Sequence, residues 1–417
     1  MNATSLSASQ LPGNDPFKVC VARQPILDGQ CNVVAYELLF RQINEDVANV
    51  ADATHATLSV INNAFTNIGI ESVLGNKKAF INFDAKTLQG DIFDFLPAGI
   101  IVLEILESVE VNDDLLERLK ALKAHGYSIA LDDFVYDSSR EPLLEIADIV
   151  KLDVSLLDAQ ALAWHVQLVE SHAKQLLAEK VETHEQFELC KSLGCSLFQG
   201  FFFAKPMKLI QADIPASTLR ILDIMNNIMA DAEITFLERA VSHDLSLTYK
   251  LLRFVNSAGL SCGRELRTVK QALSMLGRNQ LYRWLSLILF TSSGEDLNQT
   301  NALLNAALYR GRLLEIFSEY TKMQNPNELF ILGAFSYLEA LLNREFSLIM
   351  KDMLIPAPIK QALIDQDGPY WPYLHLALTI DGANIQHIES LSKNLGLALS
   401  DINQAQLLAT AYSENLS

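Results

Sequence analysis

The feature that most constrains this fold is a series of short, β-rich apolar runs in the first half of the chain. The runs span residues 18–23, 33–40, 78–83, 99–106, 128–134, 148–154, 175–181 and 196–203. Several are continuously apolar, which is typical of parallel strands covered on both faces. Amphipathic segments such as 114–125 and 185–193 lie between them, so strand and helix alternate. The pattern predicts an α/β region, a TIM-type (β/α) barrel rather than an open sheet.

The strand pattern ends after about residue 208. Helices are predicted at 219–230, 236–241, 246–256, 268–275, 280–290, 301–320 and 329–342, with shorter ones to the end. We therefore expect a flexible tail at 1–16, a barrel at 17–207 and an all-helical (all-α) domain at 208–417.

Composition narrows the classes of partner. The formal net charge is −18, and an acidic surface repels nucleic-acid backbones, so no polymeric nucleic acid is expected. No apolar run approaches the ~18 residues that cross a bilayer, so no membrane segment is expected. The first 16 residues have neither a basic start nor an apolar segment, unlike a signal peptide. We expect a cytoplasmic protein.

Polar residues stand at the ends of the apolar runs, where parallel barrels carry their functional groups. They are Glu37, Asn82, Glu104, Asp132, Asp133, Lys151, Glu179 and Gln199. A single carboxylate at a strand end is usually a helix cap or a solvated turn, but a whole ordered series is rarely a coincidence. Carboxylate and amide oxygens suit Mg²⁺ or Mn²⁺. The series predicts a metal-dependent barrel enzyme or its relic and names no substrate.

The same residues lie in recognisable motifs. They are RQPI, ELLFR, FINFD, LEILES, ALDDF, VKLD, AEKVET and FQGFFFAKP, in this order between residues 23 and 206. The ordered set resembles the EAL domain, a phosphodiesterase barrel specific for cyclic-di-GMP. The resemblance implies two Mg²⁺ or Mn²⁺ ions and hydrolysis of cyclic-di-GMP to linear pGpG.

The resemblance also implies a role for each matched residue. Metal ligands would be Glu37, Asn82, Glu104, Asp132, Asp133 and Glu179. The dinucleotide would contact Gln24, Pro25, Leu39, Arg41 and Gln199. Lys151, Glu179 and Glu182 would be catalytic, and Glu107 would anchor the loop that follows it.

Three departures from the family pattern leave the activity open. Glu-Ala-Leu is Glu-Leu-Leu here, the glycine of AEGVET is Lys180, and the Gly-rich loop after Asp133 is replaced by residues 135–139. Val and Tyr resist backbone conformations that glycine permits. The alternative to an active enzyme is therefore a silent cyclic-di-GMP sensor, or a scaffold that acts through its helical domain.

The second half resembles an HDOD domain from about residue 219, most clearly in 243–259 and 268–277. This resemblance implies a regulatory module that docks an unknown protein partner. In the EAL family the loop after the aspartate pair helps to organise a dimer contact, so the altered residues 135–139 leave a homodimer open. His243 and Asp244 invite comparison with metal-dependent HD hydrolases, but no further ligand pattern accompanies them. We expect Asp244 to cap the helix that starts at Leu245.

Overall fold

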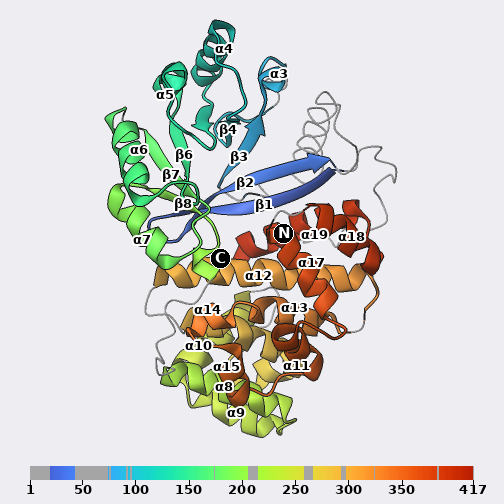
Figure 1. The fold of residues 1–417 in the computed structure, drawn as a ribbon. Helices are drawn as coiled ribbons and strands as arrows, with labels where there is room; N and C mark the ends of the chain where they lie inside the picture. Colours follow the sequence, from blue (N-terminus) through green and yellow to red (C-terminus); the bar gives the residue numbers. More distant parts are fainter. Residues whose placement is uncertain are drawn as a thin grey trace.

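A computed structural model describes residues 19–42, 74, 77–90, 93, 96–172, 174–204, 215–257, 266–292, 297–323, 325–382 and 385–416. The predicted tail and the predicted boundary at residues 207 and 208 lie outside these ranges. Figure 1 shows a strand-rich part followed by a helical part, which confirms the predicted fold class. Among the described residues, no helix is both long and apolar enough to cross a membrane.

The strand-rich part is a closed barrel whose eight strands neighbour one another in chain order. The strands are β1 (Val19–Asp28), β2 (Val33–Gln42), β3 (Lys78–Phe83), β4 (Ile101–Ile105), β5 (Ser128–Leu131), β6 (Ile149–Asp153), β7 (Gln175–Glu179) and β8 (Leu197–Gln199). Each overlaps one of the predicted apolar runs, so the positions of the strands followed from the sequence.

The direction of β1 differs from the parallel pairing that the apolar runs suggested. It pairs antiparallel with β2 and β8, whereas the neighbours from β2 to β8 are parallel. In the short turn after β1, Asp28 Oδ1 accepts the backbone N–H groups of Gln30 and Asn32, both at 2.9 Å. Parallel strands need a longer crossover, so this connection forces a hairpin.

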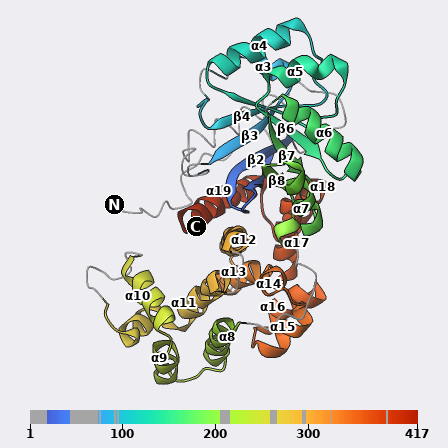
Figure 2. The same ribbon diagram turned by 90° about the vertical axis from the view of Figure 1, so that its left-hand side faces the viewer.

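Short and medium helices lie outside the barrel, as Figures 1 and 2 show. They are α3 (Ala85–Leu88), α4 (Asp113–Ala124), α5 (Glu141–Ile146), α6 (Ala159–Ser171) and α7 (His184–Leu193), with 3₁₀ turns at Ser138–Arg140 and Phe202–Ala204. Their starts follow local sequence: Asn112 accepts from Leu115 N, and Thr183 forms a capping box with Gln186.

The barrel interior contains an apolar layer with one side chain from each strand. Its members are Ile26, Ala35, Phe80, Val102, Ala130, Ile149, Leu177 and Leu197. All eight side chains are buried, so this layer is a packed core and not a channel. The polar side chains at the strand ends lie directly next to this layer, on the side of the barrel mouth.

The helical part extends to the C-terminus. Its elements are α8 (Ala216–Met229), α9 (Ile234–Ser242), α10 (Leu245–Ser257), α11 (Val269–Ser292), α12 (Leu297–Tyr320), α13 (Pro326–Phe335), α14 (Leu338–Leu342), α15 (Phe346–Asp352), α16 (Ala357–Lys360), a π-helical turn (Gln361–Asp365), α17 (Trp371–Asp381), α18 (Ile385–Leu395) and α19 (Leu399–Leu416). Two predicted helices merge in α11, which kinks at Gly277 (φ 69°, ψ 175°).

The predicted role of Asp244 is confirmed. Its Oδ1 accepts the N–H of Leu247 at 3.0 Å, and its carbonyl accepts the N–H of Thr248 at 2.8 Å. These are the contacts of an N-terminal helix cap at the start of α10. Asp244 is thereby accounted for as a structural residue.

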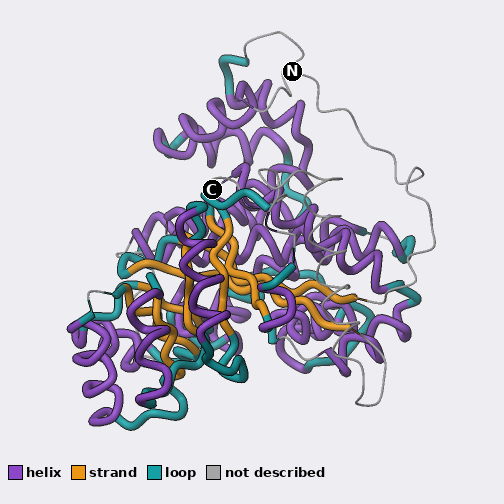
Figure 3. The backbone as a smooth tube through the Cα atoms, turned by 90° about the horizontal axis from the view of Figure 1, so that it is seen from above, coloured by secondary structure: helices purple, strands orange, loops and turns teal. Residues whose placement is uncertain are grey.

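The two parts meet along the β1–β2 hairpin. Helices α19 and α17 pack on β1, and α12 packs against α13 and α19, so the last helices of the chain lie beside its first strands (Figures 1 and 2). Figure 3, seen from above, shows the strands gathered in one region with helical segments around them.

Candidate active site

The polar side chains form a second layer above the apolar layer. In a strand, residues two positions apart point to the same side, so a polar residue two positions from each apolar member also faces the barrel interior. This layer consists of Gln24, Glu37, Asn82, Glu104, Asp132, Lys151, Glu179 and Gln199. Every strand, or the residue directly after it, thus contributes one polar group to the same mouth. Seven of these groups belong to the predicted series of strand-end residues, and Gln24 on β1 was given only by the family resemblance.

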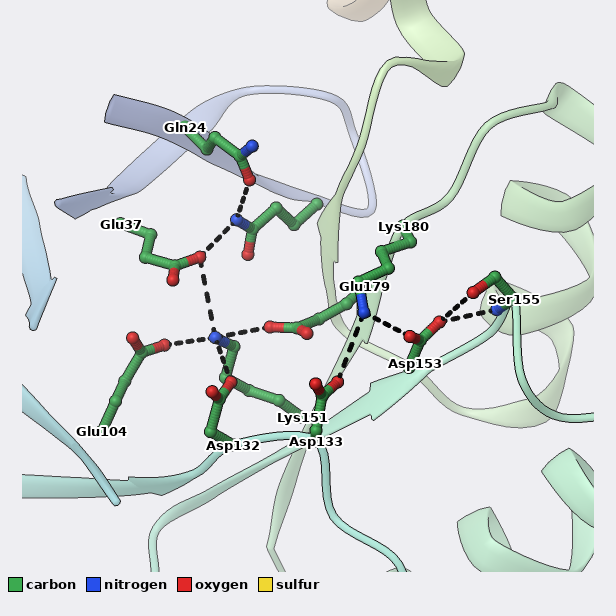
Figure 4. A network of polar contacts seen from close by, with 11 residues as sticks. Gln24, Glu37, Glu104, Asp132, Asp133, Lys151, Asp153, Ser155, Glu179 and Lys180 are labelled. Carbon is green, nitrogen blue, oxygen red and sulfur yellow. Dashed lines mark hydrogen bonds and ion pairs between the residues drawn. The ribbon is translucent and has the colours of Figure 1, made fainter. Parts of the chain in front are cut away.

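Lys151 is the centre of this layer (Figure 4). Its Nζ lies 2.5 Å from Glu104 Oε1, 2.5 Å from Glu179 Oε1, 2.8 Å from Asp132 Oδ1 and 3.6 Å from Glu37 Oε2. The Lys151 side chain is 1% exposed and that of Glu104 is fully buried. Four carboxylates therefore share one ammonium group in a place that water hardly reaches.

The crowding of carboxylates changes proton affinities. Burial raises the pKa of Glu104 to about 8, and the nearby carboxylates of Glu37 and Asp132 add to the rise; the contact with Lys151 opposes it but does not cancel it. Burial alone would lower the pKa of Lys151, but the surrounding carboxylates outweigh burial and raise it. Lys151 is consequently an ammonium ion throughout the physiological range.

The amide side chains hold Glu37 in place. Gln199 Nε2 donates to Glu37 Oε2 at 2.5 Å and to Gln24 Oε1 at 2.7 Å, and Asn82 Nδ2 donates to Glu37 Oε1 at 3.3 Å. The Oδ1 of Asn82 is buried and has no hydrogen-bond partner among the described residues. A buried oxygen without a donor is stabilised by a cation.

This inner group fits a hard divalent cation. One oxygen each from Glu37, Glu104 and Glu179 lie within 4.8 Å of one another. Carboxylate oxygens, together with the free Oδ1 of Asn82, are the donors that Mg²⁺ and Mn²⁺ prefer. Uncompensated buried carboxylates destabilise a fold, and a cation offsets their charge.

A second, shallower group of carboxylates lies at the rim. One oxygen each from Glu107, Asp132 and Asp133 also fall within 4.8 Å of one another. Asp133 has a left-handed backbone (φ 39°), and its Oδ1 is buried without a hydrogen-bond partner in the described part of the chain. Burial raises the pKa of Asp133, while Lys180 opposes the rise.

Two residues at this rim were not predicted from the sequence. Lys180 pairs closely with the Asp153 carboxylate, and its Nζ lies 3.7 Å from Asp133 Oδ1 (Figure 4). Asp153 also accepts from Ser155 N at 2.8 Å and Ser155 Oγ at 2.6 Å. The signal for Lys180 was the departure from AEGVET, and that for Asp153 was its place at the end of β6.

Comparisons with known proteins assign both parts of the chain to known domain families. Residues 18–206 match the EAL domain family and residues 212–339 match the HDOD domain family. The cyclic di-GMP phosphodiesterase CdgJ of Vibrio cholerae is 31% identical, over 96% of this chain and 94% of that protein. This chain belongs to the EAL–HDOD family. The uncharacterized protein YuxH of Bacillus subtilis is 30% identical over 91% of this chain and 94% of its own length.

Solved structures are similar to part of this chain. One is the manganese and cyclic-di-GMP complex of BlrP1 from Klebsiella pneumoniae, which is 26% identical. The match covers 46% of this chain and 56% of the BlrP1 chain, with a TM-score of 0.39.

In the EAL part, the unusual loop after Asp133 forms without glycine. No residue between 134 and 140 has a positive φ. Asp137 Oδ1 accepts from Ser139 N at 2.8 Å, and Arg140 Nη2 donates to the Glu107 carbonyl at 2.9 Å. Ordinary backbone conformations and side-chain contacts thus shape the loop, which is tied to the predicted anchor residue through its backbone.

The remaining predicted residues of the EAL site are not among the four carboxylates that contact Lys151. Glu182 is exposed at the start of α7, where its N–H donates to Gln186 Oε1 at 2.8 Å, and it is not among the carboxylates around Lys151. Pro25 lines a cavity between the EAL part and the helical part. Leu39 is half-buried on β2, and the side chain of Arg41 is outside the described part.

Proposed function

We propose that this EAL–HDOD protein is a phosphodiesterase that hydrolyses cyclic-di-GMP to linear pGpG with Mg²⁺ or Mn²⁺, two ions being bound during the reaction. The observation that carries the proposal is the excess of negative charge at the barrel mouth, where four carboxylates share Lys151. The 31% identity to CdgJ over nearly the whole chain supports the same activity.

The inner ligands of the ions would be Glu37, Asn82, Glu104 and Glu179, and the outer one Asp133. Asp132, which contacts Lys151 and also belongs to the rim group, would be a ligand between the two groups. When bound, the ions supply positive charge at the phosphodiester and activate the attacking water. Because the ammonium of Lys151 is buried and permanently charged, it orients that water or offsets charge developing on the phosphate.

The reaction breaks one phosphodiester bond of the ring. The water oxygen forms a bond to phosphorus, the bond from phosphorus to the 3′ oxygen breaks, and that oxygen takes a proton. Glu179 is our candidate for accepting the proton of the water, because it contacts Lys151 at the same mouth. Gln24 and Gln199, which are hydrogen-bonded to each other at the mouth, and Leu39, two residues after Glu37 on β2, are our candidates for contacting the dinucleotide.

The proposal predicts that Glu37→Gln abolishes turnover. The substitution keeps the size of the side chain and removes one carboxylate from the inner group. We expect a loss of pGpG formation of roughly 100-fold or more, the size typical of removing a group that stabilises transition-state charge. The measurement is chromatographic detection of pGpG from purified protein with Mn²⁺ or Mg²⁺.

Glu188→Gln is the matched control, because Glu188 is exposed on α7 away from the mouth and should leave the rate unchanged. If the unmodified protein forms no pGpG, the enzymatic proposal is wrong. Binding of cyclic-di-GMP in the same sample would then identify a sensor, and absence of binding a scaffold that acts through its HDOD part.

A further inference from the structure

Lys180 lies in a backbone conformation that favours glycine. Its φ is 55°, in the left-handed region that lysine rarely adopts. The neighbouring backbone is held from β8: Val181 N donates to the Gln199 carbonyl at 3.0 Å, and Phe202 N donates to the Val181 carbonyl at 3.2 Å. The lysine is therefore kept at a fixed and unfavourable position directly after Glu179.

The side chain of Lys180 reaches the rim carboxylates from this position. Its Nζ pairs closely with Asp153 and lies 3.7 Å from the Oδ1 of Asp133 (Figure 4). Asp153 is 5% exposed and is fixed by two hydrogen bonds from Ser155, so it holds the ammonium in place. Asp133 is thereby partly neutralised by a group of the protein itself.

The two ends of the site consequently differ in charge balance. At the inner end, Glu37, Glu104, Asp132 and Glu179 share one ammonium, so a negative excess remains. At the outer end, Asp133 and Asp153 share the ammonium of Lys180, and the nearby Glu107 is exposed, so water and salt screen its charge. A divalent cation meets an ammonium at either end, but four carboxylates share Lys151 and only two share Lys180, so the outer end has less negative charge left for the ion.

We propose that Lys180 is a built-in cation that takes the place of a divalent ion beside Asp133, so that the chain binds one divalent cation tightly at the inner end and a second only weakly at the outer end. The second ion binds when the half-exposed lysine side chain moves aside. Lys180 is thus a positioning residue that sets the metal requirement of the site. The inference rests on the proposed metal-dependent function.

The test is the binding of Mn²⁺ alone, measured by calorimetric titration and by the electron paramagnetic resonance signal of paired Mn²⁺ ions. We expect the unmodified protein to bind one ion tightly and a second weakly. Lys180→Gly and Lys180→Asn remove the ammonium while tolerating the left-handed backbone. In both, the second ion should bind roughly tenfold more tightly, a modest effect suited to a half-exposed charge.

Two variants separate charge from backbone strain. Lys180→Arg keeps the positive charge and should titrate like the unmodified protein. Lys322→Gly is the matched control, because Lys322 has a nearly identical backbone (φ 54°) in the helical part. It should relax the same strain without changing Mn²⁺ binding.

The inference is overturned if the unmodified protein binds two ions with equal affinity, if the Lys180 variants titrate like it, or if none of them binds Mn²⁺. The inference about Lys180 and the proposed enzymatic function can be contradicted independently of each other. Production of pGpG with unchanged Mn²⁺ titrations in the Lys180 variants would contradict only the role of Lys180. The expected titrations without any pGpG would contradict only the enzymatic proposal.

Discussion

At the scale of single residues, Glu104 makes the stability of the metal-free protein depend on pH. Its pKa is about 8 in the folded chain and near 4.5 when unfolded, because burial disfavours the charged form. Between these values the folded protein holds a proton that the unfolded chain has released. The free energy of unfolding therefore decreases as the pH rises through this window. Glu104→Gln should remove the part of this decrease that comes from Glu104.

The measurement is the melting temperature from pH 5 to 8.5 in the presence of a chelator. The profile of Glu104→Gln should be flatter than that of the unmodified protein, and parallel profiles would contradict the argument. Added Mn²⁺ should stabilise the unmodified protein most at the alkaline end, where the carboxylate is already ionised and binds the ion without losing a proton.

Much of the site was predictable at this scale, because the polar residues follow apolar runs of recognisable length. Once the barrel closes, the two-residue period of a strand brings Glu37, Asn82, Glu104 and Glu179 to one mouth. The contacts of Lys180 with Asp133 and Asp153 were not predictable. They depend on the direction of a long side chain between three strand ends, which the order of residues does not specify.

At the scale of elements, the end of β8 depends on Gly200. Its φ is +146°, and a Cβ at this position would lie 2.1 Å from the carbonyl oxygen of Val181. Gly200→Ala should therefore separate β8 from the segment after β7 and destabilise the protein by about 1–3 kcal/mol, the range for overpacking. Chemical denaturation measures the change in the free energy of unfolding.

Gly99→Ala is the control for the Gly200 substitution. Gly99 is exposed in a turn, and a Cβ there would have no neighbour within 4 Å. Its replacement should be nearly neutral. Equal effects of the two substitutions would show that the close approach to Val181 is not what requires glycine at position 200.

The direction of β1 shows what a pattern of apolar runs leaves out. Such a run places a strand but not its orientation, which depends on the connection. The Asp28–Gly29 pair was a hairpin signal, and the short turn that follows it reverses the chain. The kink of α11 at Gly277 was likewise marked by a glycine between two predicted helices.

At the scale of the whole molecule, the helical part packs against the strand that carries Glu37. Adjacent strand residues point to opposite sides, so Tyr36 faces the helices while Glu37 faces the site. The guanidinium of Arg23 lies 4.4 Å from the ring centre of Tyr36 and 4.0 Å from that of Tyr309 on α12. The Tyr36 hydroxyl and the Lys77 ammonium both donate to Glu414 on α19.

No local pattern could have predicted this contact, because Tyr36 and Glu414 are 378 positions apart in the chain. The contact is stabilised because the buried carboxylate of Glu414 accepts from a hydroxyl and from an ammonium group. The Glu414 side chain is 5% exposed and faces Lys77 directly. Removing one charge of such a pair leaves the other buried without compensation, which costs more than the pair itself contributes.

Glu414→Gln should therefore destabilise the protein by about 3 kcal/mol, as expected for breaking a buried pair from one side. Glu389→Gln, which breaks a surface pair with Lys393 one helical turn away, should cost less than about 0.5 kcal/mol. Both values come from denaturation of the full chain. Because Tyr36 and Glu37 are adjacent on β2, Glu414→Gln should also weaken Mn²⁺ binding at the inner group, and Glu389→Gln should not. Loss of stability with unchanged Mn²⁺ affinity would show that the C-terminal helix stabilises the barrel without influencing its site.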